Sequence, residues 1–248
     1  KAAVVLQRGL TGLAARKAAR KQAHRHDDGS GSQGFIRVIV RVRPLGEGRG
    51  TSCQLVNVDA RRHCITVTGR QSEPQRFDFE RVVSETEDNE SLERTVGTPL
   101  VEQVVQGYNG TLFAYGQTGS GKSYTIGEVA RLGTEHEGVS HRMVRALFAE
   151  LAQMHCKSYK VTLQFVQVYM ESVHDLLAEQ RPREGAQRLQ LREDKLHGVY
   201  VDGAKSVPTP TAASCLETIG LASANLAIAS TYVNRGANSE PSHSLTSC

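Results

Sequence analysis

The segment Gly107–Thr125, GYNGTLFAYGQTGSGKSYT, constrains the fold more than any other part of the chain. Within it, Gly116–Ser123 has the spacing G-x-x-x-x-G-K-[S/T] of a phosphate-binding loop. A loop of this kind must join a buried strand to a helix. The apolar run Thr111–Tyr115 predicts the strand, and after Lys122 no helix breaker occurs until Gly127. The segment therefore predicts a strand, loop and helix within an α/β domain.

The side chains of this loop suit a nucleoside triphosphate with Mg²⁺. Glycine lets backbone N–H groups close on phosphate oxygens, Lys122 supplies positive charge for the outer phosphates, and the Ser123 hydroxyl is a ligand for Mg²⁺. The cofactor-binding residues that we expect here are Gly116, Gln117, Thr118, Gly119, Ser120, Gly121, Lys122, Ser123 and Tyr124, with Ser123 as the metal ligand.

The same segment resembles the signature of the kinesin motor domain, and the resemblance continues on both sides of it. Upstream, Ile36–Leu45, IRVIVRVRPL, resembles the first motor strand with its R-x-R-P ending. Downstream, Val161–Leu177, VTLQFVQVYMESVHDLL, is similar to the family's S-x-x-E-I-Y-N-E-x-V-Y-D-L-L. Asn225–Asn234 resembles the helix that leads into the first switch. The resemblance covers about Ile36 to Cys248.

This resemblance implies a three-layer α/β phosphate-loop NTPase fold, with a mixed central sheet and helices on both faces. It implies an ATPase that moves along microtubules, with ATP and Mg²⁺ as cofactors, tubulin as partner and the cytoplasmic microtubule cytoskeleton as location. Arg41, Arg43 and Pro44 of the R-x-R-P ending are then expected beside the base and ribose, together with Tyr124.

The first switch departs from the family's pattern N-x-x-S-S-R-S-H. Aligning on Ser242 and His243 places Ser239 at the first hydroxyl, but Glu240 at the second and Pro241 at the arginine. A carboxylate there repels phosphate unless a metal lies between them, and proline offers the second switch no partner. We therefore expect weak turnover or none. The catalytic residues that the resemblance implies are Asn234, Ser239, Ser242 and His243.

A strand that ends in an acid is also needed near the Mg²⁺ ion. Val199–Asp202, VYVD, has that form, but by resemblance it belongs to a strand-loop region that touches tubulin, together with Arg192 and Lys195. The family's D-L-A-G-S-E segment does not occur before Cys248, so we expect the C-terminal part of the fold to be missing from this chain.

Two alternative functions stay open. Glu240 and Pro241 favour a non-motile kinesin-like module in which the nucleotide only sets tubulin binding. An essential Asp202 would instead favour an unrelated phosphate-loop NTPase or kinase.

The N-terminal arm, residues 1–23, carries the basic character of the chain. Lys1–Arg25 contains seven Lys or Arg residues and no acid, which leaves 23 basic and 26 acidic residues in the rest, a net charge of −3. Leucines recur at helical spacing and predict a basic amphipathic helix. The order Leu6, Gln7, Gly12, Arg16 follows an IQ motif, with Thr11 in place of its first arginine, and suggests calmodulin or another EF-hand chain as partner.

An inert helix and a transit peptide are the alternatives for this arm. The Gly/Ser-rich residues 24–34 read as a flexible linker, and residues 35–248 as the partial motor domain.

The apolar runs and the cysteines of the chain exclude further classes of protein. No apolar run reaches the length of a membrane span, and the five cysteines are scattered without a C-x-x-C pair. We therefore expect no membrane span, disulfide framework or zinc site, and no nucleic acid among the partners.

Overall fold

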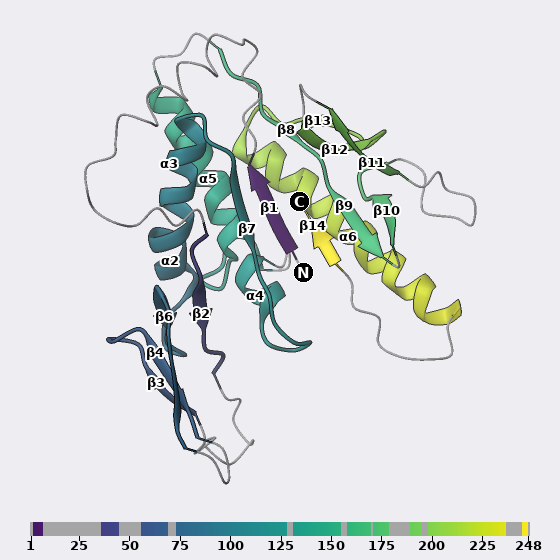
Figure 1. Cartoon of the computed structure of the whole chain (residues 1–248). Coiled ribbons are helices and arrows are strands. Elements are labelled where there is room, and N and C mark those ends of the chain that lie inside the picture. The colour runs from purple at the N-terminus through teal and green to yellow at the C-terminus, as the bar shows by residue number, and fades with distance from the viewer. Residues whose placement is uncertain are drawn as a thin grey trace.

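The computed structural model of the chain describes residues 2–6, 36–44, 56–68, 73–127, 131–154, 158–169, 171–178, 189–194, 198–236 and 245–247. Its strands and helices form a mixed α/β arrangement (Figure 1). They are β1 (Ala2–Leu6), β2 (Ile39–Arg41), β3 (Val56–Asp59), β4 (Cys64–Val67), β5 (Gln75–Asp78), β6 (Arg81–Val83), α2 (Asn89–Leu92), the π-helical η1 (Glu93–Gly97), α3 (Thr98–Val105), β7 (Gly110–Phe113), α4 (Lys122–Ile126), α5 (Val139–Gln153), β8 (Thr162–Leu163), β9 (Val166–Tyr169), β10 (Ser172–Asp175), β11 (Gln190–Asp194), β12 (Gly198–Asp202), β13 (Val207–Pro208), α6 (Ala212–Gly236) and β14 (Leu245–Ser247).

The central sheet has the strand order β10-β9-β14-β1-β7. It is mixed, because β1 runs parallel to β14 but antiparallel to β7, and β9 is antiparallel to both of its neighbours. Smaller sheets surround it: β2 pairs in parallel with β6, β3-β4-β5 form an antiparallel sheet, and β11 and β12 form a hairpin. The predicted α/β class with a mixed sheet is confirmed.

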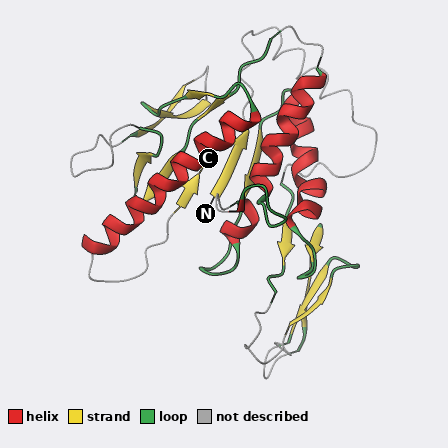
Figure 2. Cartoon of the chain, turned by 180° about the vertical axis from the view of Figure 1, so that it is seen from behind, coloured by secondary structure: helices red, strands yellow, loops and turns green. Residues whose placement is uncertain are grey.

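Helices α5 and α6 lie against one face of the strands, which Figure 2 shows from the helical side. Val144 of α5 packs with Cys215 and Leu216 of α6, while Phe165 and Leu176 pack against Ala222 further along α6. In Figure 1 the strands are nearer the viewer than these helices. Helices on the second face, which the resemblance implied, are not among the elements that the structure describes.

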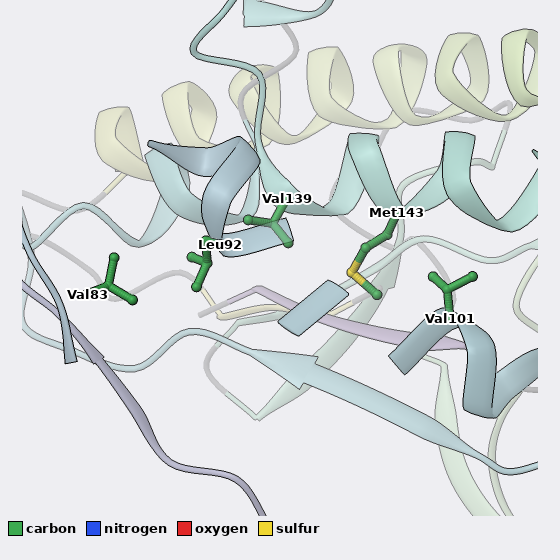
Figure 3. Packing of buried hydrophobic residues seen from close by; sticks show 5 residues of the cluster. All are labelled: Val83, Leu92, Val101, Val139 and Met143. Atoms are coloured by element: carbon green, nitrogen blue, oxygen red, sulfur yellow. The ribbon is translucent and has the colours of Figure 1, made fainter. Parts of the chain in front are cut away.

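The largest cluster of buried residues lies beside the phosphate-loop strand. Figure 3 shows Met143 of α5 between Val139 and Val101, with Leu92 and Val83 continuing the cluster toward β6. Partly buried side chains, among them Leu112 of β7, pack against it. Burial of such side chains contributes about 1.5–3 kcal/mol each. This cluster fixes α5 and the helical segment 89–105 relative to β7.

In the sequence, Leu92, Val96, Leu100 and Val104 recur at helical spacing and predict a helix. The structure confirms it as the helical segment formed by α2, η1 and α3. The sequence did not predict that the helix is wound as a π-helix over Glu93–Gly97 before α3 begins. The π-helical turn ends at Gly97, just before Thr98 and Pro99, and proline has no N–H to donate to an α-helical bond.

The N-terminal arm begins differently from its prediction. Ala2–Leu6 is a strand, so the expected helix does not include these five residues. Val4 and Val5 are β-branched and favour a strand, and the edge of β7 offers backbone partners from Gly110 to Phe113. The rest of the arm and the linker, residues 7–34, lie outside the described residues.

Cys64 and Cys215 are buried free thiols. Among the residues described, no group of three or more His, Cys, Asp or Glu side chains could hold a metal ion. None of the described helices is long and apolar enough to cross a membrane.

Candidate nucleotide-binding site

The predicted phosphate loop joins β7 to α4, as its spacing requires (Figure 1). Gly119 and Gly121 have φ angles of +79° and +101°, in the left-handed region that glycine adopts without strain. Gly121 is the N-cap of α4, so the first backbone N–H groups of this helix open onto the loop. Helix α4 is short and ends before Gly127, whose N–H donates to the Ser123 carbonyl at 2.9 Å.

Lys122 holds its ammonium group over the loop. Nζ donates to the carbonyl oxygens of Gly116 at 2.9 Å and of Gln117 at 2.7 Å. Ser123 follows it at an exposed position of α4. A cation above a turn of backbone N–H groups, with an exposed hydroxyl beside it, is the donor set that a polyphosphate with Mg²⁺ requires. The residues present therefore fit the group that the sequence predicted.

Arg43, two residues after strand β2, reaches this loop. The Arg43 guanidinium is exposed and donates to the carbonyl of Gly119. The structure thus brings the R-x-R-P ending and the phosphate loop together, although they are more than seventy residues apart in the sequence.

Arg41 faces inward instead. Its Nη1 donates to Asn89 Oδ1 and to Thr125 Oγ1, the latter at 3.0 Å, and Nη2 donates to the Glu87 carbonyl at 3.2 Å. Burial lowers the pKa of this guanidinium, while Tyr124 and the nearby acids raise it. Several N–H groups of Arg41 are therefore bonded within the protein, to Asn89, Thr125 and the Glu87 carbonyl. Arg41 stabilises the residues around the site.

Tyr124 is surrounded by polar side chains. The Arg41 and Arg131 guanidiniums lie 5.1 and 5.2 Å from its ring centroid, within the range of cation-π attraction. Its hydroxyl is 3.3 Å from His136 Nδ1. These three contacts hold the Tyr124 side chain in place directly after Ser123. The base and ribose were expected beside this side chain.

Only some of the remaining predicted residues lie in the part of the chain that the structure describes. Asn234 lies in the last part of α6, while Ser239, Ser242 and His243 lie outside the described residues. Asp202 is at the end of β12 and pairs with Arg192 across the hairpin, Oδ2 to Nε 2.8 Å. Figure 1 shows this hairpin away from the loop between β7 and α4. Lys195 lies outside the described residues.

Sequence reasoning missed three residues around Tyr124: Asn89, Arg131 and His136. Asn89 follows Asp88, whose side chain caps α2 by accepting from the Ser91 N–H at 2.7 Å. In sequence, Asp-Asn before a helix is read as a cap and nothing more. The contact with Tyr124 bridges 35 positions, and no local pattern indicates it.

Comparisons with known proteins agree with this geometry. The family described as "Kinesin motor domain" matches residues 41–248. The chain is 33% identical over 240 residues to Kinesin-like protein KIN-12F of Oryza sativa subsp. japonica, covering 90% of this chain and 8% of that protein. It is also 33% identical over 216 residues to Kinesin-like protein 3 of Schizosaccharomyces pombe, covering 85% of this chain and 37% of that protein.

A solved structure of a fast kinesin superposes with a TM-score of 0.71 at 30% sequence identity, covering 80% of this chain and 55% of that chain. The chain therefore spans about half of that solved chain and a smaller share of these curated relatives. The family that the signature predicted is confirmed by sequence and by fold, and this chain belongs to the kinesin motor domain family.

Proposed function

We propose that this chain binds Mg·ATP and Mg·ADP through Gly116–Ser123 and forms the nucleotide-binding part of a microtubule motor ATPase. The observation that carries the proposal is the preformed loop, with Gly121 at the start of α4 and Lys122 held across it by two carbonyls. Membership of the kinesin motor domain family supports ATP as the nucleotide and tubulin as the partner.

Each group of the loop has a role in this proposal. The backbone N–H groups of the loop and the Lys122 ammonium bind the phosphates, and Ser123 supplies a hydroxyl to Mg²⁺. Arg43, Pro44 and Tyr124 lie beside the base and ribose, while Arg41 acts through Tyr124. Mg²⁺ held at the Ser123 hydroxyl would supply positive charge to the phosphates.

The first switch is proposed to be Asn234, Ser239, Ser242 and His243, by resemblance. Glu240 and Pro241 stand where the family has a hydroxyl and an arginine, so the groups that orient water and close the site are altered. A site that holds nucleotide without these groups turns it over slowly. We therefore propose that the chain binds nucleotide and hydrolyses it weakly or not at all.

The partners follow from the same assignment. Tubulin is proposed to meet the β11–β12 hairpin, where Arg192 and Tyr200 are cross-strand neighbours. Location on cytoplasmic microtubules follows from this partner. For residues 1–23 we propose calmodulin or another EF-hand chain, on the IQ-like spacing alone.

A non-motile module in which the nucleotide sets tubulin affinity is the second candidate, favoured by Glu240 and Pro241. The unrelated phosphate-loop NTPase is excluded, because the chain belongs to the kinesin motor domain family. Asp202, on which that alternative depended, pairs with Arg192 in a separate hairpin.

Co-sedimentation with polymerised tubulin tests the proposal, together with a phosphate-release assay on the same samples. We expect the fraction bound to differ between Mg·ADP and a non-hydrolysable ATP analogue, with little tubulin-dependent phosphate release. Lys122→Ala should abolish the nucleotide difference, and Lys160→Ala, at an exposed lysine after α5, should retain it.

Equal sedimentation with both nucleotides would contradict the proposal. A fast tubulin-dependent release that Lys122→Ala removes would instead show that the divergent switch is competent and that the chain is a working motor ATPase.

A further inference from the structure

Asn89 is a fully buried amide at the start of α2, with 0% of its surface exposed. Buried polar groups of this kind are retained when their hydrogen bonds are made. Its Nδ2 donates to the Tyr124 carbonyl at 3.0 Å and to the His136 carbonyl at 3.3 Å, and its Oδ1 accepts from Arg41. Both amide hydrogens and the amide oxygen are therefore used.

These partners come from three separate segments of the chain. Arg41 lies on β2, Tyr124 on α4 directly after the phosphate loop, and His136 on the loop before α5. Tyr124 is near the C-terminal end of α4, where helix carbonyls lack partners within the helix. The Asn89 amide supplies that missing donor and at the same time orients the Arg41 guanidinium, 5.1 Å from the Tyr124 ring.

The chemistry at this position requires an amide. A carboxylate would accept from Arg41 but could not donate to two carbonyls, and it would place its charge against their oxygens. An apolar residue would remove one of the partners of Arg41, which keeps Thr125 and the Glu87 carbonyl, and would leave the Tyr124 and His136 carbonyls without the Asn89 donor. Leaving a buried acceptor unpaired costs more than the hydrogen bond itself contributes.

We propose that Asn89 is a positioning residue for the base side of the nucleotide site, acting through Tyr124 and Arg41. This inference rests on the proposed binding of nucleotide at Gly116–Ser123. The phosphate side has supports of its own, since Lys122 bonds the Gly116 and Gln117 carbonyls and Arg43 bonds Gly119. Loss of Asn89 should therefore weaken contacts with the nucleoside while leaving those with the phosphates in place.

Titration calorimetry with two probes separates the two sides: Mg·ADP, which carries base and phosphates, and Mg·tripolyphosphate, which carries phosphates only. In Asn89→Ala the Kd for Mg·ADP should rise about tenfold, as expected for loss of a charge-assisted buried bond. The Kd for Mg·tripolyphosphate should change less than about twofold.

Asn225→Ala is the matched control. It removes an amide of α6 whose Nδ2 donates at 2.8 Å to the carbonyl of Leu176, just after β10. Because this contact does not involve the nucleotide site, both Kd values should remain those of the wild type. Lys122→Ala should weaken both probes.

If Asn89→Ala does not fold, Thr125→Val removes the hydroxyl that accepts from Arg41 at 3.0 Å while keeping the side-chain shape. It should raise the Kd for Mg·ADP about threefold and leave that for Mg·tripolyphosphate unchanged.

An unchanged Kd for Mg·ADP in folded Asn89→Ala would overturn the assignment. Equal losses for both probes would also overturn it, because they would indicate a general structural role. Unchanged binding of both probes in Lys122→Ala would show instead that the proposed nucleotide site itself is wrong.

Discussion

His141 is buried at the start of α5 with 1% of its surface exposed. Burial lowers the pKa of its imidazole, which the Glu137 carboxylate raises and Arg145 lowers further. The N-terminal end of a helix also disfavours a positive charge. Among the described residues no group accepts from or donates to its Nδ1. The folded protein therefore holds this histidine neutral to a lower pH than the unfolded chain does.

This difference predicts how stability depends on pH. The unfolded histidine takes up a proton near pH 6.5, while folded His141 does so only at lower pH. As pH falls below about 6.5 the unfolded state binds more protons, so the free energy of unfolding decreases, by at most about 1.4 kcal/mol per pH unit. His141→Gln should flatten this dependence between about pH 7.5 and 5.5, measured by urea unfolding at several pH values.

The matched control is His136→Gln, which removes a histidine from an exposed position. In this variant, the pH dependence of the free energy of unfolding that arises from buried His141 should persist. Glu87 acts in a different window: burial raises the pKa of its carboxyl, but the Ser84 N–H and Arg81 lower it overall, so its stabilisation is lost only below about pH 4.5. Equal slopes in the wild type and His141→Gln would contradict this account.

Helices α4 and α5 meet end to end, and their contact sets the position of the phosphate-loop helix. The Ser140 hydroxyl donates to the Ile126 carbonyl at 2.7 Å, which satisfies one of the last carbonyls of α4. Gly138 lies so close that a Cβ there would be 2.1 Å from Gly127 Cα and 2.4 Å from the Ile126 oxygen. Both are backbone atoms, which cannot rotate out of the way.

Gly138→Ala should therefore separate the two helices. We expect it to lower the free energy of unfolding by about 3 kcal/mol, at the upper end for overpacking, and to weaken nucleotide binding because α4 moves. Gly133→Ala is the control, since a Cβ there meets nothing within 4 Å and costs only the strain of its left-handed backbone, about 1 kcal/mol. Denaturant unfolding of both variants gives the comparison, and equal losses would show that the junction is not tightly packed.

Local pattern predicted the elements whose signals are local. The limits of α4 follow from Lys122 and Gly127. Apolar residues at helical spacing in 92–104 and 144–151 predict the helices that precede and follow β7 in the sequence, and both are present. The run Val161–Tyr169 has the composition of a strand and predicts one. This strand is present but divided into β8 and β9 at Gln164 and Phe165. The composition of the segment predicts that a strand exists. The break depends on distant partners, because β8 pairs with β13 and β9 pairs with β14.

Features that depend on distant partners could not be read from the sequence. Ala2–Leu6 has the composition of either a helix or a strand, and the backbone of β7 decides between them. Asn89 gives only a cap signal, because its partners lie 35 to 48 residues away. The roles assigned to Ser239, Ser242 and His243 stay predictions, since these residues lie outside the described part of the chain.

The nucleotide site is built from segments that lie far apart in the sequence. The loop lies at the end of β7, Arg43 follows β2, and the contacts of Tyr124 come from α2, β2 and the loop before α5. A ligand that binds only the folded arrangement stabilises all of these segments together, by about 2.7 kcal/mol when it is present at a hundred times its Kd.

Titration of Mg·ADP into the purified chain, with heat as the readout, measures that binding directly. We predict one nucleotide bound per chain. In Lys122→Ala the binding free energy should be less favourable by about 1.5–3 kcal/mol, the value of a charge-assisted hydrogen bond to phosphate. The Lys160→Ala control should bind as the wild type does. Equal affinities in the wild type and Lys122→Ala would contradict the assignment of Gly116–Ser123 as the phosphate-binding loop of this chain.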